Sequence, residues 1–538
     1  MDQMINKKKI NINISLILYS LLIAMLFILA KGYMFNTGDQ AEHLPPVYKL
    51  IDPCLYSHDY YMIPFIAEGF TVRFFYVYFI YYLSFIISVP AICFLITVLS
   101  IALTSYSISE ITRFFTKNQN AIYLSPVLVL LVFYNYTLGG NNIQYSYCIS
   151  SGISKAIITF GILKFFKKNY IYSGLMLGIA SLFHPLAGLQ IFLILFLVLI
   201  FKGNSDIKKS FIRLLRFSIL FIIPALLAVL PVIFKQTSGS FIYDKKLYNT
   251  IMYYFKFPQH FNPLMFPLLS YIKFIALLVV GIFILSLRKF EVKKEVNFFF
   301  IITISGMILY TMFFSGLKYY EVGKVQWFKT SIWIVMFSSI LISSYVSGFF
   351  PDRLTKLLIK NTGIISIILI CISGFIILDS QAIPIERIQN RYMVGKYRKS
   401  DLTKIHEWIE KNTPVDAVFL TSPDDFGFLA EAKRSLITGY KAMLIHNPEF
   451  IINWYLTYKE IYGVGIDDVK YKYFPMHTVG EEIYPSDLYN TRNVRDFYPS
   501  KYKIDYRIDN IRDCKYLNKL GSQVHREGDY VVTKFNIP

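Results

Sequence analysis

Charged residues are scarce in this chain, and cysteines are few. Asp, Glu, Lys and Arg make up 17% of the 538 residues, whereas hydrophobic residues make up 55%. In soluble domains about a quarter of the residues are charged, so this composition does not suit a set of soluble domains. The mean hydropathy is +0.45, and the apolar residues form runs too long for a globular core. We therefore predict an α-helical polytopic membrane protein.

The five cysteines include no Cys-x-x-Cys pair, so the sequence carries no thiolate metal or redox motif. Cys93 and Cys371 lie within apolar runs, where cysteine behaves as a small hydrophobic residue. Cys54, Cys148 and Cys514 face the same side in the topology described below. A disulfide between two of them fits the sequence, but spacing alone does not establish its geometry.

A surface for binding nucleic acid is also missing, although the formal net charge is +20. The lysines and arginines occur in small groups between apolar runs, without a basic-aromatic reader motif. We therefore expect no nucleic-acid partner. The basic groups instead follow the distribution that orients membrane proteins.

Apolar segments of about 17 to 25 residues predict about eleven membrane crossings. They cover residues 11–34, 80–107, 120–137, 152–166, 169–185, 186–201, 214–234, 266–287, 297–315, 330–349 and 362–379. With the N-terminus inside, about 20 positive charges fall in the inner connections and about 10 in the outer loops. We predict a multi-pass protein of the plasma (inner) membrane, with a cytoplasmic N-terminus and an extracytoplasmic C-terminal domain.

The composition changes beyond Gln381, which predicts a domain boundary there. We expect a transmembrane domain over residues 1–380 and a small extracytoplasmic α/β domain over residues 381–538. The expected elements of the second domain are helices over 401–411 and 449–462 and strands over 417–420, 434–438 and 530–535.

Titratable residues of the membrane domain concentrate in its first outer loop, residues 36–73. If the start of this loop is helical, Asp39, Glu42 and His43 share one face, where they can share a proton or a cation. Asp39 is the leading catalytic candidate, as a general base or as a ligand of a divalent cation such as Mg²⁺ or Mn²⁺. Glu42 is the second. The alternative is that Asp39 only caps the helix that follows it.

Eight polar residues of the first loop, the helix ends and the other outer loops are candidates for substrate binding. They are His43, His58, Asp59, Arg73, His184, His260, Lys324 and Lys329. Each has a simpler alternative: loop residues are often merely solvated, and basic side chains at helix ends often extend to lipid headgroups. His184 lies at membrane depth, where an ionisable side chain needs a partner.

Several short motifs resemble one superfamily of enzymes. They are Gly38-Asp39, His184-Pro185, Pro258-Gln-His260-Phe-Asn-Pro263 and the stretch from Trp408 to Pro423. With the predicted topology, they resemble the polytopic glycosyltransferases that use lipid-phosphate sugars. That superfamily has the C-type glycosyltransferase fold and includes protein mannosyltransferases, aminoarabinose transferases and oligosaccharyltransferases. The likeness is to a bacterial branch and covers nearly the whole chain.

The resemblance implies that Asp39 is the catalytic acid of the first loop and that the donor is a polyprenyl-phosphate-linked sugar. The acceptor would be a surface glycan, a lipid or a protein of the cell envelope. Many members carry two adjacent acids at this point, whereas Asp39 is followed by Gln40 and the next acid is Glu42, so metal dependence does not follow. The chain also lacks the Trp-Trp-Asp signature of oligosaccharyltransferases, which argues against asparagine glycosylation.

Two other classes of function fit the same sequence. A transporter or flippase for a lipid-linked saccharide would use the polar outer groups for binding only, but ionisable residues are scarce in the centres of the crossings. A non-catalytic protein of envelope-polysaccharide assembly would use its outer domain as a docking module.

Overall fold

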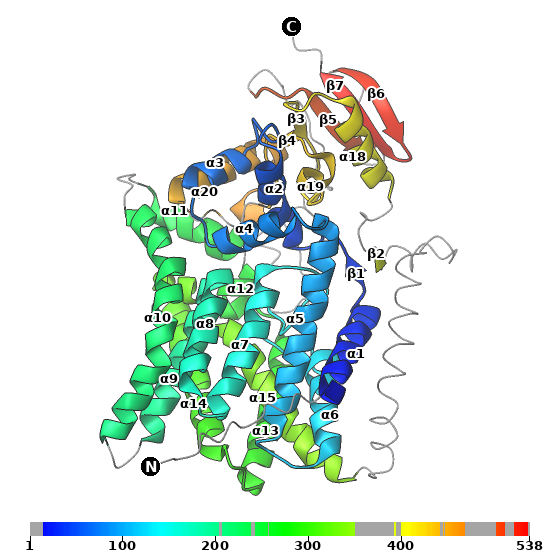
Figure 1. The fold of residues 1–538 in the computed structure, drawn as a ribbon. Helices are drawn as coiled ribbons and strands as arrows, with labels where there is room; N and C mark the ends of the chain where they lie inside the picture. Colours follow the sequence, from blue (N-terminus) through cyan, green and yellow to red (C-terminus); the bar gives the residue numbers. More distant parts are fainter. Residues whose placement is uncertain are drawn as a thin grey trace, which may run out of the picture.

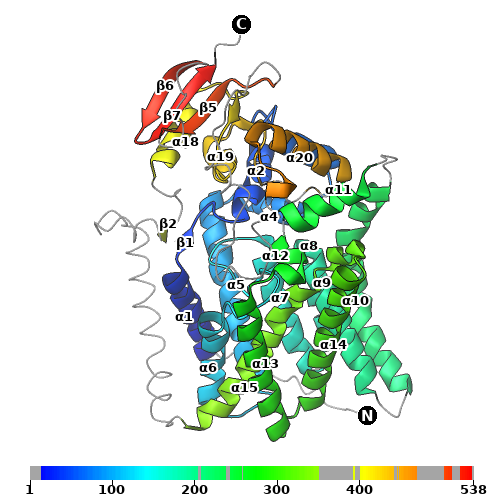
Figure 2. The ribbon, with the colours of Figure 1, turned by 180° about the vertical axis from the view of Figure 1, so that it is seen from behind.

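The computed structural model of the protein combines a bundle of long helices with a layer of shorter elements at one end (Figure 1). It describes residues 14–203, 207–237, 243–256, 258–349, 392–393, 400–441, 445, 447–468, 502–511 and 521–535. The end layer contains the first loop and the tail domain, by which we mean the described residues from 400 onward. The view from behind shows the same arrangement (Figure 2). A site between the layer and the bundle can therefore draw residues from distant parts of the chain.

Seven helical segments of the described chain are long and apolar enough to cross a membrane. They contain α1 (Ile14–Lys31), α5 (Val89–Thr112), α9 (Pro185–Lys202), α10 (Ile207–Thr237), α13 (Leu268–Leu287), α14 (Lys293–Thr311) and α15 (Ser331–Val346). The shorter helices α6 (Gln119–Val127), α7 (Ser150–Phe166) and α8 (Tyr170–Phe183) pack among them. The chain is thus an α-helical polytopic membrane protein with a small C-terminal sheet domain, as predicted.

Most of the predicted crossings that fall on described residues are helical, but residues 84–88 interrupt the one over 80–107, and two others are markedly shorter than a full crossing of about 20 residues. One is α6, where Pro126 lacks an N–H group and the helix continues as the π-helix η1 (Leu128–Val132). Another is α8, which ends because Pro185 forces His184 into extended backbone. The predicted crossing over 362–379 and the predicted boundary at 380 lie outside the described residues.

Close helix contacts hold the middle of the bundle. Helix α8 packs against α7 and α10. A Cβ atom at Gly174 would lie 1.9 Å from the carbonyl oxygen of Phe217, and one at Gly178 would lie 2.9 Å from that of Phe221. Small residues spaced in this way let two membrane helices approach to backbone contact. The bundle therefore offers a fixed base for the end layer.

The end layer of the membrane domain consists of short helices. In the first loop and at its end these are α2 (Gln40–Ile51), α3 (Met62–Glu68) and α4 (Phe74–Leu83). Further along the chain they are α11 (Lys245–Thr250), η2 (Ile251–Lys256), α12 (Pro258–Phe261), η3 (Pro263–Met265), η5 (Tyr320–Val325) and η6 (Trp327–Thr330). Most of these connections are turns of irregular helix, so they bring polar side chains close to the bundle without extended loops.

The tail domain is a five-stranded mixed sheet with three described helices. Its elements are α18 (Asp401–Asn412), β3 (Val418–Leu420), α19 (Phe428–Ala432), β4 (Ser435–Leu436), α20 (Pro448–Tyr462), β5 (Tyr506–Asn510), β6 (Gly521–Glu527) and β7 (Tyr530–Phe535). The strand order is β4-β3-β5-β7-β6, with β3 parallel to β4 and β5, and β7 antiparallel to β5 and β6. A separate pair of short strands joins β1 (Tyr33–Met34) to β2 (Tyr392–Met393).

The helices and strands predicted for the tail are all present within a few residues of their expected bounds. Helix α18 follows the expected apolar spacing, and Ile405 and Ile409 are buried. Strands β5 and β6 were not predicted. The sequence of β6, Gly-Ser-Gln-Val-His-Arg-Glu, is largely polar because this strand is mostly exposed at the sheet edge, whereas β5, Tyr-Arg-Ile-Asp-Asn, is an inner strand that carries polar residues although it is mostly buried.

The first loop is joined to the tail domain by hydrogen bonds to its backbone. The Tyr56 hydroxyl donates to the carbonyl oxygen of Leu429 at 2.6 Å. The Tyr60 N–H group donates to the carbonyl oxygen of Leu436 at 3.1 Å, and the Tyr60 hydroxyl donates to that of Lys441. The loop and the tail therefore form one rigid layer.

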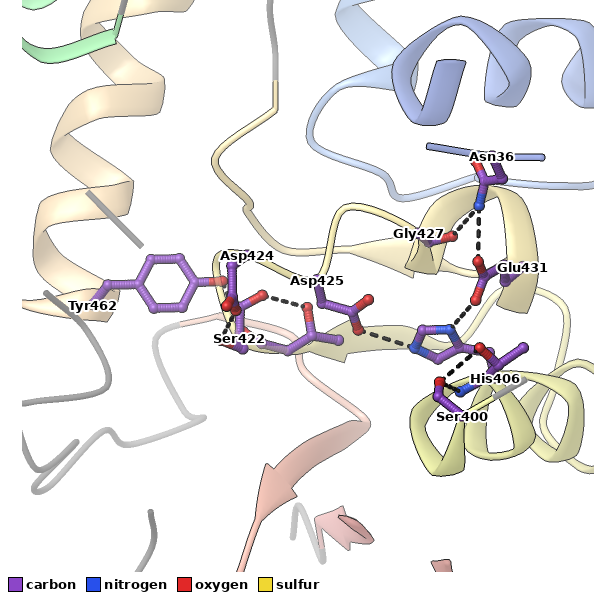
Figure 3. Close-up of polar contacts among 11 residues, drawn as sticks. Asn36, Ser400, His406, Ser422, Asp424, Asp425, Gly427, Glu431 and Tyr462 are labelled. Atoms are coloured by element: carbon purple, nitrogen blue, oxygen red, sulfur yellow. Dashed lines mark hydrogen bonds and ion pairs between the residues drawn. The ribbon is translucent and has the colours of Figure 1, made fainter. Parts of the chain in front are cut away.

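A buried histidine of the tail, His406, is linked to Asn36 of the first loop through Glu431 (Figure 3). His406, 1% exposed, lies between two carboxylates: its Nδ1 is 2.7 Å from Glu431 Oε2 and its Nε2 is 3.0 Å from Asp425 Oδ2. The other oxygen of Glu431 accepts a hydrogen bond of 3.0 Å from Asn36 Nδ2. Asn36 in turn donates its backbone N–H group to Gln40 Oε1 at 2.7 Å. This chain of contacts runs from the tail to the first residue of α2.

The charge of His406 follows from its surroundings. Burial lowers the pKa of His406, but Asp425 and Glu431 outweigh that effect and raise its pKa to about 10. His406 is thus an imidazolium that neutralises two buried carboxylates. Residues 422–425 form a turn, closed by the Asp425 N–H group donating to the Ser422 carbonyl oxygen at 3.0 Å, and Asp425 carries one of these carboxylates.

We expect His406→Ala to destabilise the end layer, because it leaves Asp425 and Glu431 buried without their cation. Removing one member of a buried ion pair costs about 3–5 kcal/mol. Tryptophan fluorescence of the detergent-solubilised protein during unfolding measures this loss. Lys404→Ala, on the exposed side of the same helix, is the matched control and should unfold like the wild type.

The stabilisation by His406 also depends on pH. Its pKa is raised on folding, so the contribution is complete below about pH 6.5 and is lost as the pH rises toward 10. The difference in unfolding temperature between wild type and His406→Ala should shrink over this range. A difference that stays constant up to pH 10 would contradict the ion pairing.

Candidate functional site

A cavity of about 1150 Å³ lies between the first loop, the adjacent ends of the bundle helices and the tail domain. Most of the polar residues singled out in the sequence line it: Asp39, Glu42, His43, Arg73, His184, His260, Lys324 and Lys329. The tail contributes a further wall through residues 437, 438, 445, 447–450, 453, 454 and 457. The cavity therefore brings together groups from the first loop, the junction of α8 and α9, the turns at residues 260 and 326, and the tail.

Asp39 lies immediately before α2, in the position of a helix cap, but its side chain makes no capping hydrogen bond. Its Oδ1 instead lies 3.2 Å from the ammonium nitrogen of Lys441 in the tail. The side chain is 47% exposed, and it lines the cavity. The simple alternative, that Asp39 serves only to cap α2, is thus wrong.

The chain conformation before Asp39 requires glycine. Gly38 has a positive φ of 57°, which residues with a side chain rarely adopt. A Cβ atom there would also lie 2.7 Å from the hydroxyl oxygen of Tyr147. Gly38 thus lets the loop turn sharply under Tyr147 and places Asp39 at the cavity wall.

The charge of Asp39 is set by its neighbours. Burial raises the pKa of Asp39, but Lys441, His43 and His260 together outweigh burial and hold the pKa well below its usual range. Asp39 is therefore a carboxylate over the whole physiological pH range.

Glu42 and His43 follow on the same helix, as the spacing predicts, and are 2% and 3% exposed. The His43 ring packs against Tyr76 with centroids 5.1 Å apart. Burial lowers the pKa of His43 to about 3, and the nearby Arg73 acts in the same direction. His43 is consequently neutral, and its Nδ1 has no hydrogen-bond partner among the described residues.

The three candidate metal ligands, Asp39, Glu42 and His43, are not grouped as metal-binding side chains in the described structure. Within the described parts of the chain, no three His, Cys, Asp or Glu side chains are grouped closely enough to hold a metal ion. Asp39, Glu42 and His43 share a helix but are not such a group. The Asp39 carboxylate is moreover paired with the Lys441 ammonium, whose positive charge disfavours a metal cation beside it.

Two cations of the cavity are available to a ligand. Arg73 precedes α4, where one guanidinium N–H group donates to the carbonyl oxygen of Val72 at 3.3 Å and Nε has no partner among the described residues. The Lys329 ammonium in η6 likewise has none in the described chain. Lys324 differs, because it is exposed and lies 2.9 Å from Glu321.

His184 and His260 present different nitrogen atoms to the cavity. His184 Nδ1 accepts a hydrogen bond of 3.3 Å from the N–H group of Ala187, so a neutral His184 carries its proton on Nε2. His260 Nδ1 lies 3.0 Å from the carbonyl oxygen of Gly139, so its Nδ1 carries the proton and Nε2 is an acceptor. Burial, with Lys329 next in effect, lowers the pKa of His260 to about 3.

The loop that holds His260 is itself held by a buried lysine. Lys155, 2% exposed, donates to Asn141 Oδ1 at 2.6 Å and to the carbonyl oxygen of Asn142 at 2.5 Å. A Cβ atom at Gly140 would lie 2.9 Å from His260 Nδ1. Lys155 thus neither extends to the headgroups nor lines the cavity. It shapes the Gly/Asn-rich loop, residues 139–142, that supports His260.

Two predicted substrate-binding residues lie elsewhere. His58 is exposed, and its backbone N–H group donates to Ser435 Oγ at 3.2 Å. Asp59 is fully buried and accepts hydrogen bonds from the N–H groups of Tyr61, Met62 and Leu436 at 2.8–2.9 Å. Burial raises the pKa of Asp59 to about 6, although these N–H groups partly offset the effect. The expectation that these two residues complete the site is therefore corrected: Asp59 joins the loop to β4.

Sequence reasoning missed the residues that the tail contributes. Lys441 is separated from Asp39 by 402 positions, and its neighbours in the sequence form no recognisable motif. Helix α20 adds Glu449, Asn453 and Thr457 to the cavity wall. Their spacing of four residues is visible in the sequence, but nothing there shows which structure the helix face meets.

Comparisons with known proteins give limited matches. Residues 400–461 match a family model described as a domain of unknown function (DUF6798). No curated protein matches the chain. Among solved structures, the chain is similar to the oligosaccharyltransferase of Archaeoglobus fulgidus, tethered to an acceptor peptide containing the NVT sequon. The identity is 11%, the TM-score is 0.43, and the match covers 93% of this chain and 69% of that one.

Proposed function

We propose that the protein is a membrane glycosyltransferase that transfers a sugar from a polyprenyl-phosphate-linked donor to an acceptor on the side of the tail domain. The observation that carries this proposal is the arrangement of Asp39, Arg73 and Lys329 around one cavity. It combines a carboxylate that makes no capping hydrogen bond with two cations that form no ion pair with any described residue. The motifs that resemble glycosyltransferases using lipid-phosphate sugars support the same reading.

Arg73 and Lys329 are suited to bind the phosphate of the donor. A guanidinium group can donate two parallel hydrogen bonds to phosphate oxygens, and an ammonium group adds a point charge. The Nε2–H group of His184 lies in the same cavity and is a third donor. The positive charge of this cluster stabilises the phosphate as it leaves the sugar.

The lipid chain of the donor needs an apolar path beside this cluster. Pro64, Phe70 and Leu186 line the cavity. On α3, Ile63 and Ile66 are 48% and 49% exposed. An apolar helix face beside a membrane bundle is suited to contact lipid, so the chain can stay in the bilayer while its phosphate enters the cavity.

Asp39 is suited to act on the acceptor. Its carboxylate accepts a hydrogen bond from the acceptor hydroxyl, whose oxygen forms a bond to the anomeric carbon from the side opposite the phosphate. The bond between that carbon and the phosphate oxygen breaks, and its electron pair leaves with the phosphate. Because the pKa of Asp39 is low, it takes the hydroxyl proton only as the new bond forms and that oxygen becomes acidic.

Lys441 is a positioning residue in this scheme. Its ammonium group holds the Asp39 carboxylate in place and supplies positive charge that a divalent cation would otherwise bring. We therefore propose a transfer that needs no Mg²⁺ or Mn²⁺ at Asp39. We further propose that the cavity faces the outside of the plasma membrane, where nucleotide sugars are not available.

Asp39→Asn should abolish most sugar transfer, because an amide does not accept the hydroxyl proton. General base catalysis contributes about 10²–10⁴-fold, so we expect a loss of at least 100-fold in kcat. The assay uses purified protein and a radiolabelled polyprenyl-phosphate sugar. Asp416→Asn, an exposed tail residue, is the matched control.

Lys441→Met tests the second part of the scheme. Without the ammonium group the pKa of Asp39 rises, so the acid limb of the pH–rate profile should move to higher pH. A pH–rate profile that does not move would exclude Lys441 from this role.

Transfer by Asp39→Asn at the wild-type rate would exclude Asp39 as the general base.

Arg73→Ala and Lys329→Met should weaken donor binding. Hydrogen bonds to charged groups are worth about 1.5–3 kcal/mol, so each change should raise the donor KM by roughly 10- to 100-fold. Lys324→Met should have a smaller effect, because Lys324 is exposed and paired with Glu321. Equal effects of all three substitutions would show that the cations act only through the general field of the cavity.

A further inference from the structure

Part of the cavity wall is formed by one face of helix α20. The helix begins at Asn447, whose Oδ1 accepts a hydrogen bond of 2.9 Å from the N–H group of Glu449. Its inner face is fixed by packing, since Trp454 Nε1 donates to the carbonyl oxygen of Gly439 at 2.8 Å and Tyr458 packs against Phe255. The orientation of the remaining faces is therefore fixed as well.

The face of α20 that meets the cavity carries a polar stripe, which consists of Glu449, Asn453 and Thr457. Residues four positions apart lie on one side of a helix, so these three side chains form a row. Among the described residues, none is hydrogen-bonded to any of the three side chains. The stripe thus offers a carboxylate, an amide and a hydroxyl group to whatever enters the cavity.

The chemistry of the stripe differs from that of the cation cluster. It contains no cation, and Glu449 disfavours an anionic ligand. A carboxylate, an amide and a hydroxyl group together accept and donate hydrogen bonds, which suits a ligand with many hydroxyl groups. Tyr243 and Tyr248 add aromatic surface to the same cavity, which suits the apolar C–H faces of sugar rings.

The size of the cavity leaves room for such a ligand. Sites for small molecules typically measure about 300–1,000 Å³, and this cavity has about 1150 Å³. The donor phosphate belongs near Arg73 and Lys329, so the part of the cavity under α20 is open to a second molecule. Asp39 lines the same cavity, pairs with Lys441 of the tail and lies within electrostatic reach of Lys329.

We propose that the acceptor is a neutral carbohydrate and that the polar stripe of α20 binds its hydroxyl groups beside Asp39. This inference rests on the proposed transferase function and names its acceptor. Apolar residues also line the cavity, among them Phe450 and Trp454 of α20, but the hydrogen-bonding side chains of the stripe would have no partner on an apolar lipid acceptor.

The test uses full-length protein in lipid nanodiscs with a radiolabelled polyprenyl-phosphate sugar. Acceptors come from the envelope of a strain that lacks the protein, separated into neutral glycans, anionic glycans, peptides and lipids. We expect label in the neutral glycan fraction. Label in any other fraction would overturn the inference.

Substitutions in the stripe give the second arm. Asn453→Ala and Thr457→Ala should each raise the KM for the neutral glycan fraction by roughly 10-fold and leave the donor KM unchanged. Leu456→Ala, on an exposed face of α20 away from the cavity, is the control. An acceptor KM that no stripe substitution changes would overturn the inference.

Hydrolysis of the donor separates this inference from the function on which it rests. Glycosyltransferases pass the sugar slowly to water when the acceptor is absent, so stripe variants should hydrolyse the donor at the wild-type rate. If wild-type protein neither transfers nor hydrolyses the labelled sugar, the proposed function fails. If it does either one but the stripe variants behave like wild type, only the carbohydrate acceptor fails.

Discussion

The ion pair between Asp39 and Lys441 is the contact on which the candidate site depends. It joins the first loop of the membrane domain to the tail across 402 positions of sequence, with 3.2 Å between the charged atoms. Neither part holds a complete site alone, because the cation cluster lies on the membrane domain and the polar stripe lies on the tail. The position and the charge of Asp39 both follow from this pairing, so the proposed chemistry requires the two parts to be docked.

The rest of the fold keeps this contact in register. Close packing at Gly174 and Gly178 gives the bundle a fixed shape, and α2 lies in the layer at its end, packed against α4 and α19 (Figure 1). The His406 imidazolium links the tail to Asn36 and thereby to the start of α2, and Asp59 binds β4 to the loop from the other side. Buried polar groups thus serve here mainly to align two domains. The residues that remain available for a ligand are the ones that line the cavity.

Much of the fold and part of the candidate site are predictable from the sequence. Crossings follow from apolar runs, and α18 and α20 follow from helical periodicity. The spacing of Asp39, Glu42 and His43 is local, so their common helix can be expected. Proline at 185 explains why His184 lies at a chain bend. In each case the cause lies within a few residues of the element that it determines.

The errors arise where a side chain meets a distant partner. Asp59 has the composition of a site residue, but its oxygens are used by N–H groups, one of them on β4. Lys155 lies near the start of the predicted crossing over 152–166, yet its ammonium group binds Asn141 and Asn142. His406 and Lys441 carry no motif, because their roles come from three-dimensional contacts alone.

The most direct test of the proposed site is a cryo-electron microscopy structure with polyprenyl phosphate bound. We expect the phosphate to bind Arg73 and Lys329, beside an Asp39 carboxylate that is still paired with Lys441. A phosphate bound at the other end of the bundle, or an Asp39 side chain turned away from the cavity, would contradict it.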